Sequence, residues 1–293
     1  MRKRVSCVLL FLAMSVSVRA ENPTEVVETS GVQGGLVVVI GVDDADTLAA
    51  YRPNNSYLVH GLDTSPSKVA AVREQLVEQG LYGKVTVDVF DGETLPYVDR
   101  LVNLVVSGGG CQVAGEEIER VLAPRGMALI AGKKSVQPVP SDIDDWGHFL
   151  YDAAAKNASR DTVAYFPEHL QWEAGPLHDR HHDTVQGIEA IVSCNGRLFY
   201  IVDDAPPSVS DALPDQWRLV ARDAFSGVLL WKREMGEFGW KAWAEKALIG
   251  RFNNPKDMQR RVVAVGNQVY ATLAYDAPVS ELDAATGKVL KTY

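Results

Sequence analysis

The feature that most constrains this chain is a short pattern that occurs twice near its end. Each copy contains an Asp, two further residues, a Ser or Thr and then a Gly, with an apolar run behind it. The first copy lies in Ala221–Trp231 and the second in Glu281–Lys291. Asp and Ser/Thr oxygens accept backbone N–H groups inside tight turns, and Gly adopts the positive φ that other residues resist. The repeat therefore predicts two similar hairpin turns in an all-β region.

The repeated positions resemble the repeat of the pyrroloquinoline quinone (PQQ) family of quinoprotein-like β-propellers, over residues 188–293. The positions that carry the resemblance are Asp223, Gly227, Trp231, Asp283, Thr286 and Gly287. In that family the Trp docks one blade against the next, and PQQ sits over a calcium ion. The resemblance implies about two blades of an incomplete propeller, with PQQ-dependent dehydrogenation as one function.

The second copy departs from the family pattern, and the chain contains too few repeats for a closed propeller. Glu281 and Lys291 stand where the family pattern has Ala and Trp. Propellers close with about four to eight blades. We therefore expect this chain to be the N-terminal part of a longer protein that supplies further blades.

Earlier in the chain, apolar runs alternate with helix-like segments. The runs at 35–41, 57–63, 85–90, 101–107 and 127–131 are typical of strands buried in a parallel sheet. Ser65 followed by Pro66 predicts a helix start, and the helix is expected to reach about Gly80. Its apolar face is predicted to contain Val69, Val72, Leu76 and Val77. A shorter helix is expected over 116–122, ended by Pro124. The alternation predicts a Rossmann-like α/β domain over 35–134.

Residues typical of a cofactor cleft stand at three strand ends. Gly41 and Asp43 follow the first strand, Asp63 ends the second and Asp91 follows the third. These positions resemble the motifs of class I S-adenosylmethionine (SAM) methyltransferases, in which the second-strand acid bonds the ribose and the segment after the third strand holds the adenine. The resemblance implies a SAM-like cleft formed by these four residues. Asn103 replaces the usual fourth-strand acid and the loop after Gly41 lacks further glycines, so we interpret the domain as degenerate.

The N-terminus reads as a targeting segment. Arg2, Lys3 and Arg4 precede an apolar core, Val5–Val18, that is too short to span a bilayer. We predict a signal peptide over residues 1–20, export to the periplasm or cell envelope, and no stable membrane insertion after cleavage; an uncleaved membrane anchor is the alternative. The net charge of −9 argues against a nucleic-acid-binding surface.

Residues 135–187 are expected to form a linker and an entry segment to the propeller. His178, His181, His182 and Asp183 are candidate ligands for zinc, copper or iron. The alternative is a hydrogen-bonded loop, in which Arg180 could bind an anion. Cys111 and Cys194 stand far apart, do not indicate a disulfide framework, and are expected to be buried thiols.

Three functions stay open on the sequence alone. The leading hypothesis is an exported binding or scaffold protein built on the propeller, with the methyltransferase-like domain as a binding or packing module. The alternatives are a PQQ-dependent dehydrogenase that uses calcium and a SAM-dependent methyltransferase.

Overall fold

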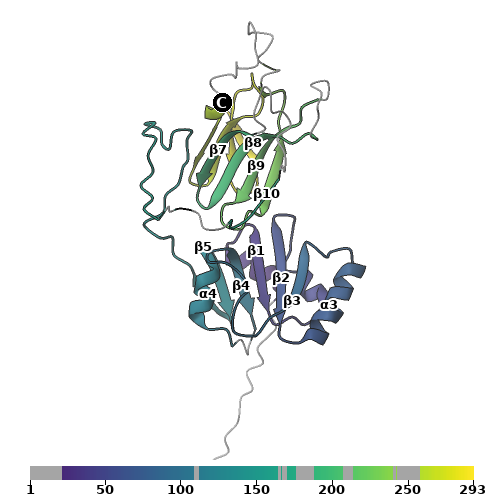
Figure 1. Ribbon diagram of the computed structural model, residues 1–293. Helices are drawn as coiled ribbons and strands as arrows, with labels where there is room; N and C mark the ends of the chain where they lie inside the picture. Colours follow the sequence, from purple (N-terminus) through teal and green to yellow (C-terminus); the bar gives the residue numbers. More distant parts are fainter. Residues whose placement is uncertain are drawn as a thin grey trace, which may run out of the picture.

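The computed structural model describes residues 22–108, 112–163, 166, 170–175, 188–206, 214–239, 242 and 258–293. Within them the chain forms an α/β domain, Pro23–Val136, and a β region, Ile188–Tyr293 (Figure 1). The α/β and all-β characters expected for the two parts are confirmed. Among the described residues, no helix combines the length and the hydropathy needed to cross a bilayer.

The α/β domain is built on one six-stranded sheet in the order β3-β2-β1-β4-β5-β6. Its strands are β1 (Gly35–Ile40), β2 (Tyr57–Asp63), β3 (Val85–Val89), β4 (Val102–Ser107), β5 (Leu122–Ile130) and β6 (Lys133–Val136). The first five run parallel, and β6 is antiparallel to β5. All six residues of β4 are buried, as expected of a central strand covered on both faces. The chain reverses its strand order between β1 and β4, which is the Rossmann-like arrangement.

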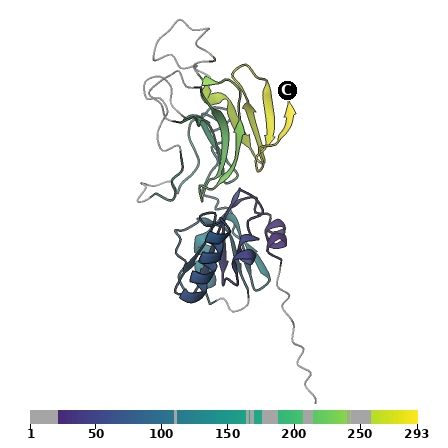
Figure 2. The same ribbon diagram turned by 90° about the vertical axis from the view of Figure 1, so that its right-hand side faces the viewer.

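Helices cover both faces of this sheet. They are α1 (Pro23–Ser30), α2 (Ala45–Ala49), α3 (Pro66–Glu78) and α4 (Gly115–Val121). The first three share one hydrophobic core with the sheet, and α4 packs in a second core on the other face. Figure 2 shows α3 lying along one face of the sheet. Ser65 caps α3 by accepting the Lys68 N–H, and Pro66 occupies its first turn, which confirms the predicted helix start.

Two local expectations for the helices were wrong. Val77 is 58% exposed, because only Val69, Val72 and Leu76 of α3 turn into the core. The residues before β1, for which no helix was predicted, form α1, which has two buried residues, Val26 and Val27. A helix of two turns is too short to show a clear apolar periodicity in the sequence.

The stretch after α4 also differs from the prediction. Pro124 lies inside β5, at a register shift between the residues that pair with Val102 and Leu104. Such a bulge accommodates a proline, because the extra residues make no ladder hydrogen bond there. Ser135 and Val136, expected in a linker, belong to β6 and pair with Ala128 and Met127.

The β region consists of two four-stranded antiparallel sheets. The first, β7 (Ile188–Cys194), β8 (Arg197–Asp203), β9 (Trp217–Asp223) and β10 (Leu229–Glu234), pairs consecutive strands. The second does the same with β11 (Val262–Val265), β12 (Gln268–Thr272), β13 (Val279–Asp283) and β14 (Val289–Thr292). One core of buried residues contains side chains from both sheets. The predicted hairpins are confirmed.

The two repeat turns are covered in the same way by two tryptophans. Trp231 Nε1 donates to Ala284 O at 3.0 Å, and a Cβ on Gly287 would lie 2.7 Å from its ring. Trp172 Nε1 donates to Ala224 O at 3.1 Å, and a Cβ on Gly227 would overlap its ring. Trp231 thus docks the first sheet on the turn of the second, and the entry segment supplies the corresponding Trp for the first turn.

The entry segment also contacts both sheets directly. Trp146 bridges to Ser193 of β7 with backbone hydrogen bonds of 3.0 and 2.8 Å. The next residue, Gly147, accepts the Ala264 N–H of β11 at 2.9 Å. A Cβ on Gly147 would overlap Ala264 O, so the close backbone approach requires Gly.

The α/β domain meets the β region at the amino ends of its parallel strands. Asn103, near the start of β4, donates from Nδ2 to Asp223 Oδ2 at 2.8 Å. Ser56, just before β2, donates from Oγ to Leu230 O at 2.6 Å. Arg197 donates to Gln33 Oε1 at 2.8 Å. These three contacts define what we call the seam.

Candidate functional site

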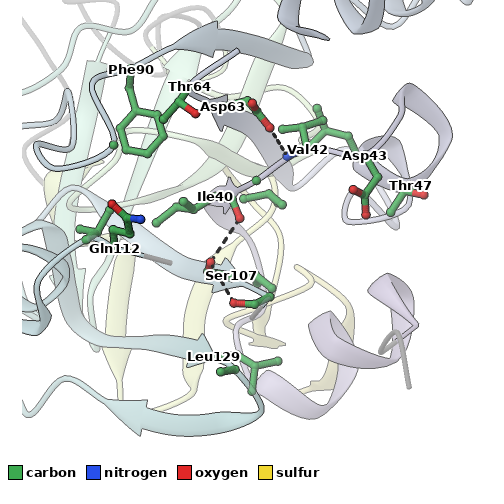
Figure 3. Close-up of a pocket in the computed structure, with 18 of the residues that line it drawn as sticks. Ile40, Val42, Asp43, Thr47, Asp63, Thr64, Phe90, Ser107, Gln112 and Leu129 are labelled. Atoms are coloured by element: carbon green, nitrogen blue, oxygen red, sulfur yellow. Dashed lines mark hydrogen bonds between the residues drawn. The ribbon is translucent and has the colours of Figure 1, made fainter. Parts of the chain in front are cut away.

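A cavity of about 690 Å³ opens at the carboxyl ends of β1, β2 and β4 (Figure 3). This is the edge of a Rossmann-like sheet at which ligands bind, beside the reversal of strand order. All four residues expected in a SAM-like cleft line it: Gly41, Asp43, Asp63 and Asp91. The structure therefore brings together side chains that lie on three separate loops of the chain.

Gly41 begins the loop after β1. Its N–H donates to Leu62 O at 2.8 Å, which holds the loop against the end of β2. Its φ is 82°, a conformation that favours glycine, and no atom lies within 4 Å of the position that a Cβ would take. The backbone of Gly41 is therefore open to the cavity.

Asp63, the last residue of β2, is the most enclosed acid of this cavity. Its Oδ2 accepts the Val42 N–H at 3.1 Å and Lys68 Nζ at 3.0 Å, and its Oδ1 accepts the Ser65 N–H at 3.0 Å. Burial alone would raise the pKa of Asp63, but these hydrogen bonds outweigh it and hold the pKa below its ordinary value. Asp63 is therefore ionised at neutral pH and fixes the loop after β1, as Figure 3 shows for Val42.

Lys68 is the site residue that sequence reasoning missed. It lies in the first turn of α3, and Nζ also comes within 4.0 Å of Asp43 Oδ1 on the exposed rim. The sequence contained a signal for this contact. Because α3 starts three residues after Asp63, a long side chain in its first turn, such as that of Lys68, can reach back to this acid. The cavity thus contains a cation between two carboxylates.

Asp91 has a mainly local role in this structure. Its Oδ1 accepts the Thr94 N–H at 2.7 Å and the Glu93 N–H at 2.8 Å, and these bonds lower the pKa of Asp91. They form a turn directly after Phe90. In Figure 3, Phe90 and Gln112 lie on one side of the cavity, and Asp43 lies on the other.

Asn103 does not stand at the cleft. It lies near the amino end of β4, whereas the cavity is lined by Ser107 and Gly108 at the carboxyl end. Asn103 Oδ1 accepts the Leu36 N–H at 2.8 Å, and its Nδ2 serves the seam. The reading of Asn103 as a lost cleft acid was therefore wrong, because the motif was matched at the wrong end of the strand.

The repeat-turn residues have structural roles that the pattern predicted. Asp223 Oδ1 accepts the Ser226 N–H and hydroxyl, each at 2.7 Å, and Asp283 Oδ1 accepts those of Thr286 at 2.8 and 2.7 Å. Gly227 and Gly287 have φ of 69° and 68°. These residues build turns, and the contacts described so far assign them no ligand.

The proposed metal ligands, His178, His181, His182 and Asp183, lie outside the described residues. Cys111 lies outside them as well. Among the residues that the structure does describe, no three or more His, Cys, Asp or Glu side chains gather as metal ligands would. The metal site therefore stays a prediction.

Part of the chain is similar in sequence to a known methyltransferase. No family model matches the chain. Over 133 residues the chain is 30% identical to a ubiquinone/menaquinone biosynthesis C-methyltransferase of Hydrogenovibrio crunogenus. The matched region covers 42% of this chain and 52% of the relative. The chain thus spans about half the length of this curated relative. The α/β domain is methyltransferase-like.

Solved structures of methyltransferases are similar to part of the chain. A putative SAM-dependent methyltransferase from Methanococcus maripaludis is 19% identical, with a TM-score of 0.34 over 37% of this chain and 54% of that one. A SAM-dependent methyltransferase from Aquifex aeolicus is 20% identical, with a TM-score of 0.33 over 37% of this chain and 62% of that one. Both TM-scores lie below 0.5, so the methyltransferase-like assignment rests on the strand order and the sequence match.

Proposed function

We propose that the cavity at the carboxyl ends of β1, β2 and β4 binds SAM, and that the α/β domain is a SAM-dependent methyltransferase. The observation that carries this proposal is the meeting of Gly41, Asp63 and Asp91 around one cavity of about 690 Å³. That volume lies within the range of about 300–1,000 Å³ typical of small-molecule sites. The similarity to a C-methyltransferase supports the reaction class.

The residues of the cavity fit a nucleoside cofactor. Any side chain larger than that of Gly41 would fill the open space beside the backbone at this position. Because Gly41 has no side chain, a ligand can approach the backbone closely there. Phe90 offers an aromatic wall next to the loop that Asp91 supports. SAM would supply an electrophilic methyl group on its sulfonium, and the residues of this chain would bind and orient it.

The contacts of Asp63 restrict how a ribose can bind. A carboxylate has about four lone-pair sites. The N–H groups of Val42 and Ser65 and the ammonium of Lys68 already use three of them. Asp63 can therefore accept about one ribose hydroxyl without rearrangement. Lys68, which reaches both Asp63 and Asp43, is placed to meet the carboxylate of the ligand.

Calorimetric titration of SAM and S-adenosylhomocysteine into the purified chain tests this proposal. We expect Gly41→Ala to weaken SAM binding about tenfold or more. The added methyl group would keep the ligand from the backbone, and losing one hydrogen bond to a charged group costs about 1.5–3 kcal/mol. The matched control is Gly80→Ala. Gly80 has a similar φ of 68° and equally open space, but it does not line the cavity.

The control separates backbone strain from the loss of the site. Both alanines carry the strain of a left-handed residue, so both variants should lose similar stability. Equal weakening of SAM binding in the two variants, or no SAM binding to the unaltered chain, would argue against the proposal.

We also propose, from the matched Trp172 and Trp231 contacts, that the β region is two consecutive units of a quinoprotein-like propeller in an exported binding protein. Two sheets that repeat the same strand order, the same Asp turn and the same covering Trp support this reading. Mass spectrometry of the protein recovered from a secreting bacterial host tests export, with an N-terminus at Glu21 as the expected result. In that experiment an intact Met1 would contradict export by signal cleavage. A separate titration with PQQ and calcium tests the oxidoreductase alternative.

A further inference from the structure

A second cavity lies in the seam, at the opposite end of the parallel strands from the SAM-like cavity. Its volume is about 390 Å³, also within the range of about 300–1,000 Å³ found for small-molecule sites. Both parts of the chain line it. The α/β domain contributes Gln33 and Arg125, and the β region contributes Asn195, Arg197 and Asn267.

Two arginines line this cavity, one from each part of the chain. Arg125 lies in the bulge of β5 with φ of 67°, a strained value for a residue other than glycine. It extends across the seam, because a Cβ on Gly196 would lie 3.9 Å from its Nη1. Arg197 starts β8. Burial is the largest influence on Arg197 and lowers its pKa, and the nearby Arg125 charge acts in the same direction. The charges of Asp223 and Asp283 act in the opposite direction. Arg197 is half-buried and Arg125 is exposed, and the two like charges line the same cavity.

The carboxylate that lines the cavity is already engaged. Asp223 accepts hydrogen bonds from Asn103, from the Phe225 N–H and from both the N–H and the hydroxyl of Ser226. Among the described residues, no carboxylate oxygen lies within 4.0 Å of a guanidinium nitrogen of Arg125 or Arg197. Arg197 instead donates to the neutral Gln33 Oε1.

The remaining polar groups add donors. Asn195 Nδ2 donates to Asn267 Oδ1 at 3.0 Å, which joins corresponding turns of the two sheets and leaves the Asn267 amide NH₂ for other acceptors. An arginine that loses water normally gains a carboxylate or phosphate partner, because the uncompensated desolvation of a charge is costly. Asp223 and Asp283 lie near enough to act on Arg197 through their charge, but the lining carboxylate, Asp223, already accepts four other hydrogen bonds.

We propose that the seam cavity is an oxoanion-binding site, in which Arg125 and Arg197 clamp a phosphate or carboxylate group of a small molecule. The planar guanidinium presents a fork of N–H donors that matches either group. Because the two arginines come from different parts of the chain, the ligand would bridge the α/β domain and the β region. The site is separate from the SAM-like cavity and does not depend on it.

Thermal unfolding of the full chain, followed by circular dichroism, tests the proposal with two probes at constant ionic strength. Inorganic phosphate and citrate represent the two oxoanion classes, and sodium chloride is the reference. A ligand that binds only the folded state raises Tm with concentration. We expect a rise in Tm with phosphate, with citrate or with both, and the responding probe identifies the class.

Variants decide whether the rise comes from this site. Arg125→Gln and Arg197→Gln should each abolish it, and Arg197→Lys should reduce it because the fork is lost while the charge stays. Lys84→Gln, an exposed change outside the cavity, should leave it intact. The proposal is overturned if neither oxoanion exceeds chloride, or if the rise persists in either glutamine variant. For each variant the Tm with oxoanion is compared with the Tm of the same variant without it, so a lower starting Tm does not affect the result.

Discussion

Asn103 Nδ2 donates a 2.8 Å hydrogen bond to Asp223 Oδ2, and both residues are buried. The same Asn103 side chain accepts the Leu36 N–H at 2.8 Å, so one amide connects β1, β4 and the first repeat turn. Residues that lie 120 positions apart in the chain thus share one hydrogen bond. The seam is therefore a specific polar contact.

Asn103→Ala should destabilise the chain strongly. The change leaves the partly buried Leu36 N–H without this partner and removes one donor from a buried carboxylate. Each loss costs about 1–3 kcal/mol, and we expect about 3 kcal/mol in total. Urea unfolding measures the change. Asn55→Ala, at an exposed Asn that accepts only from Arg52, should stay within about 0.5 kcal/mol; a similarly small effect at Asn103 would contradict the described seam.

Asp223 should make stability depend on pH in an identifiable direction. Burial raises the pKa of Asp223, and Arg197 is the nearby cation. A carboxyl whose pKa is higher folded than unfolded binds its proton more tightly in the folded state. Its contribution to stability is therefore present below the unfolded pKa and is lost as pH rises through the folded pKa.

Asp223→Asn removes this titration while it keeps an oxygen that can accept the Ser226 hydrogen bonds. We expect the free energy of unfolding of the variant, relative to the unaltered chain, to increase as pH rises from about 4 toward 7. Urea unfolding at matched pH values measures the difference. A difference that stays constant across this range would mean that Asp223 titrates in the folded chain as it does in the unfolded one.

The repeat turns should tolerate no side chain where a tryptophan covers them. In Gly287→Ala the new Cβ would lie 2.7 Å from the Trp231 ring, in addition to the strain of a positive φ. The matched control is Gly266→Ala, with φ of 58° and no atom near the new Cβ. The control should cost about 1–2 kcal/mol from strain, and Gly287→Ala at least about 1–3 kcal/mol more from overpacking. Chemical denaturation compares them, and equal costs would argue against the docking contact.

Cys194 should react slowly with thiol reagents in the folded chain. Burial and the neighbouring Asp145 carboxylate raise the pKa of Cys194 to about 11. Since the thiolate is the reactive form, little of it exists at pH 8. Iodoacetamide labelling followed by peptide mass spectrometry should find Cys194 unmodified without urea and modified in urea. Rapid native labelling would show that the thiol is more accessible than its packing implies.

Much of the fold follows from local patterns in the sequence. Buried parallel strands appear as continuous apolar runs, and Ser65 with Pro66 marks the start of α3 because capping depends on adjacent residues. The repeat turns were predicted for the same reason: Asp, Ser or Thr, and Gly act within five residues of one another. The Gly41, Asp63 and Asp91 cluster was expected from the resemblance to class I SAM methyltransferases, and the structure brings the three residues together at one cavity.

What the sequence did not show depends on contacts between distant segments. The 2.8 Å bond of Asn103 to Asp223 required the relative position of two separately folded parts. The bulge around Pro124 depends on the partner strand β4, and the pairing of Lys68 with Asp63 depends on the turn between β2 and α3. The Trp172 contact was missed because the pattern pointed to Trp231 alone.

The placement of the seam at the amino ends of β1, β2 and β4 gives the α/β domain two poles. The described β sheets attach at the amino ends of the strands, whereas the cavity opens at the carboxyl ends. If the cavity binds SAM as proposed, a bulky acceptor could reach it without first displacing those sheets. Loss of chemistry and loss of assembly should accordingly be genetically separable, with substitutions at Gly41 affecting the first and substitutions at Asn103 the second.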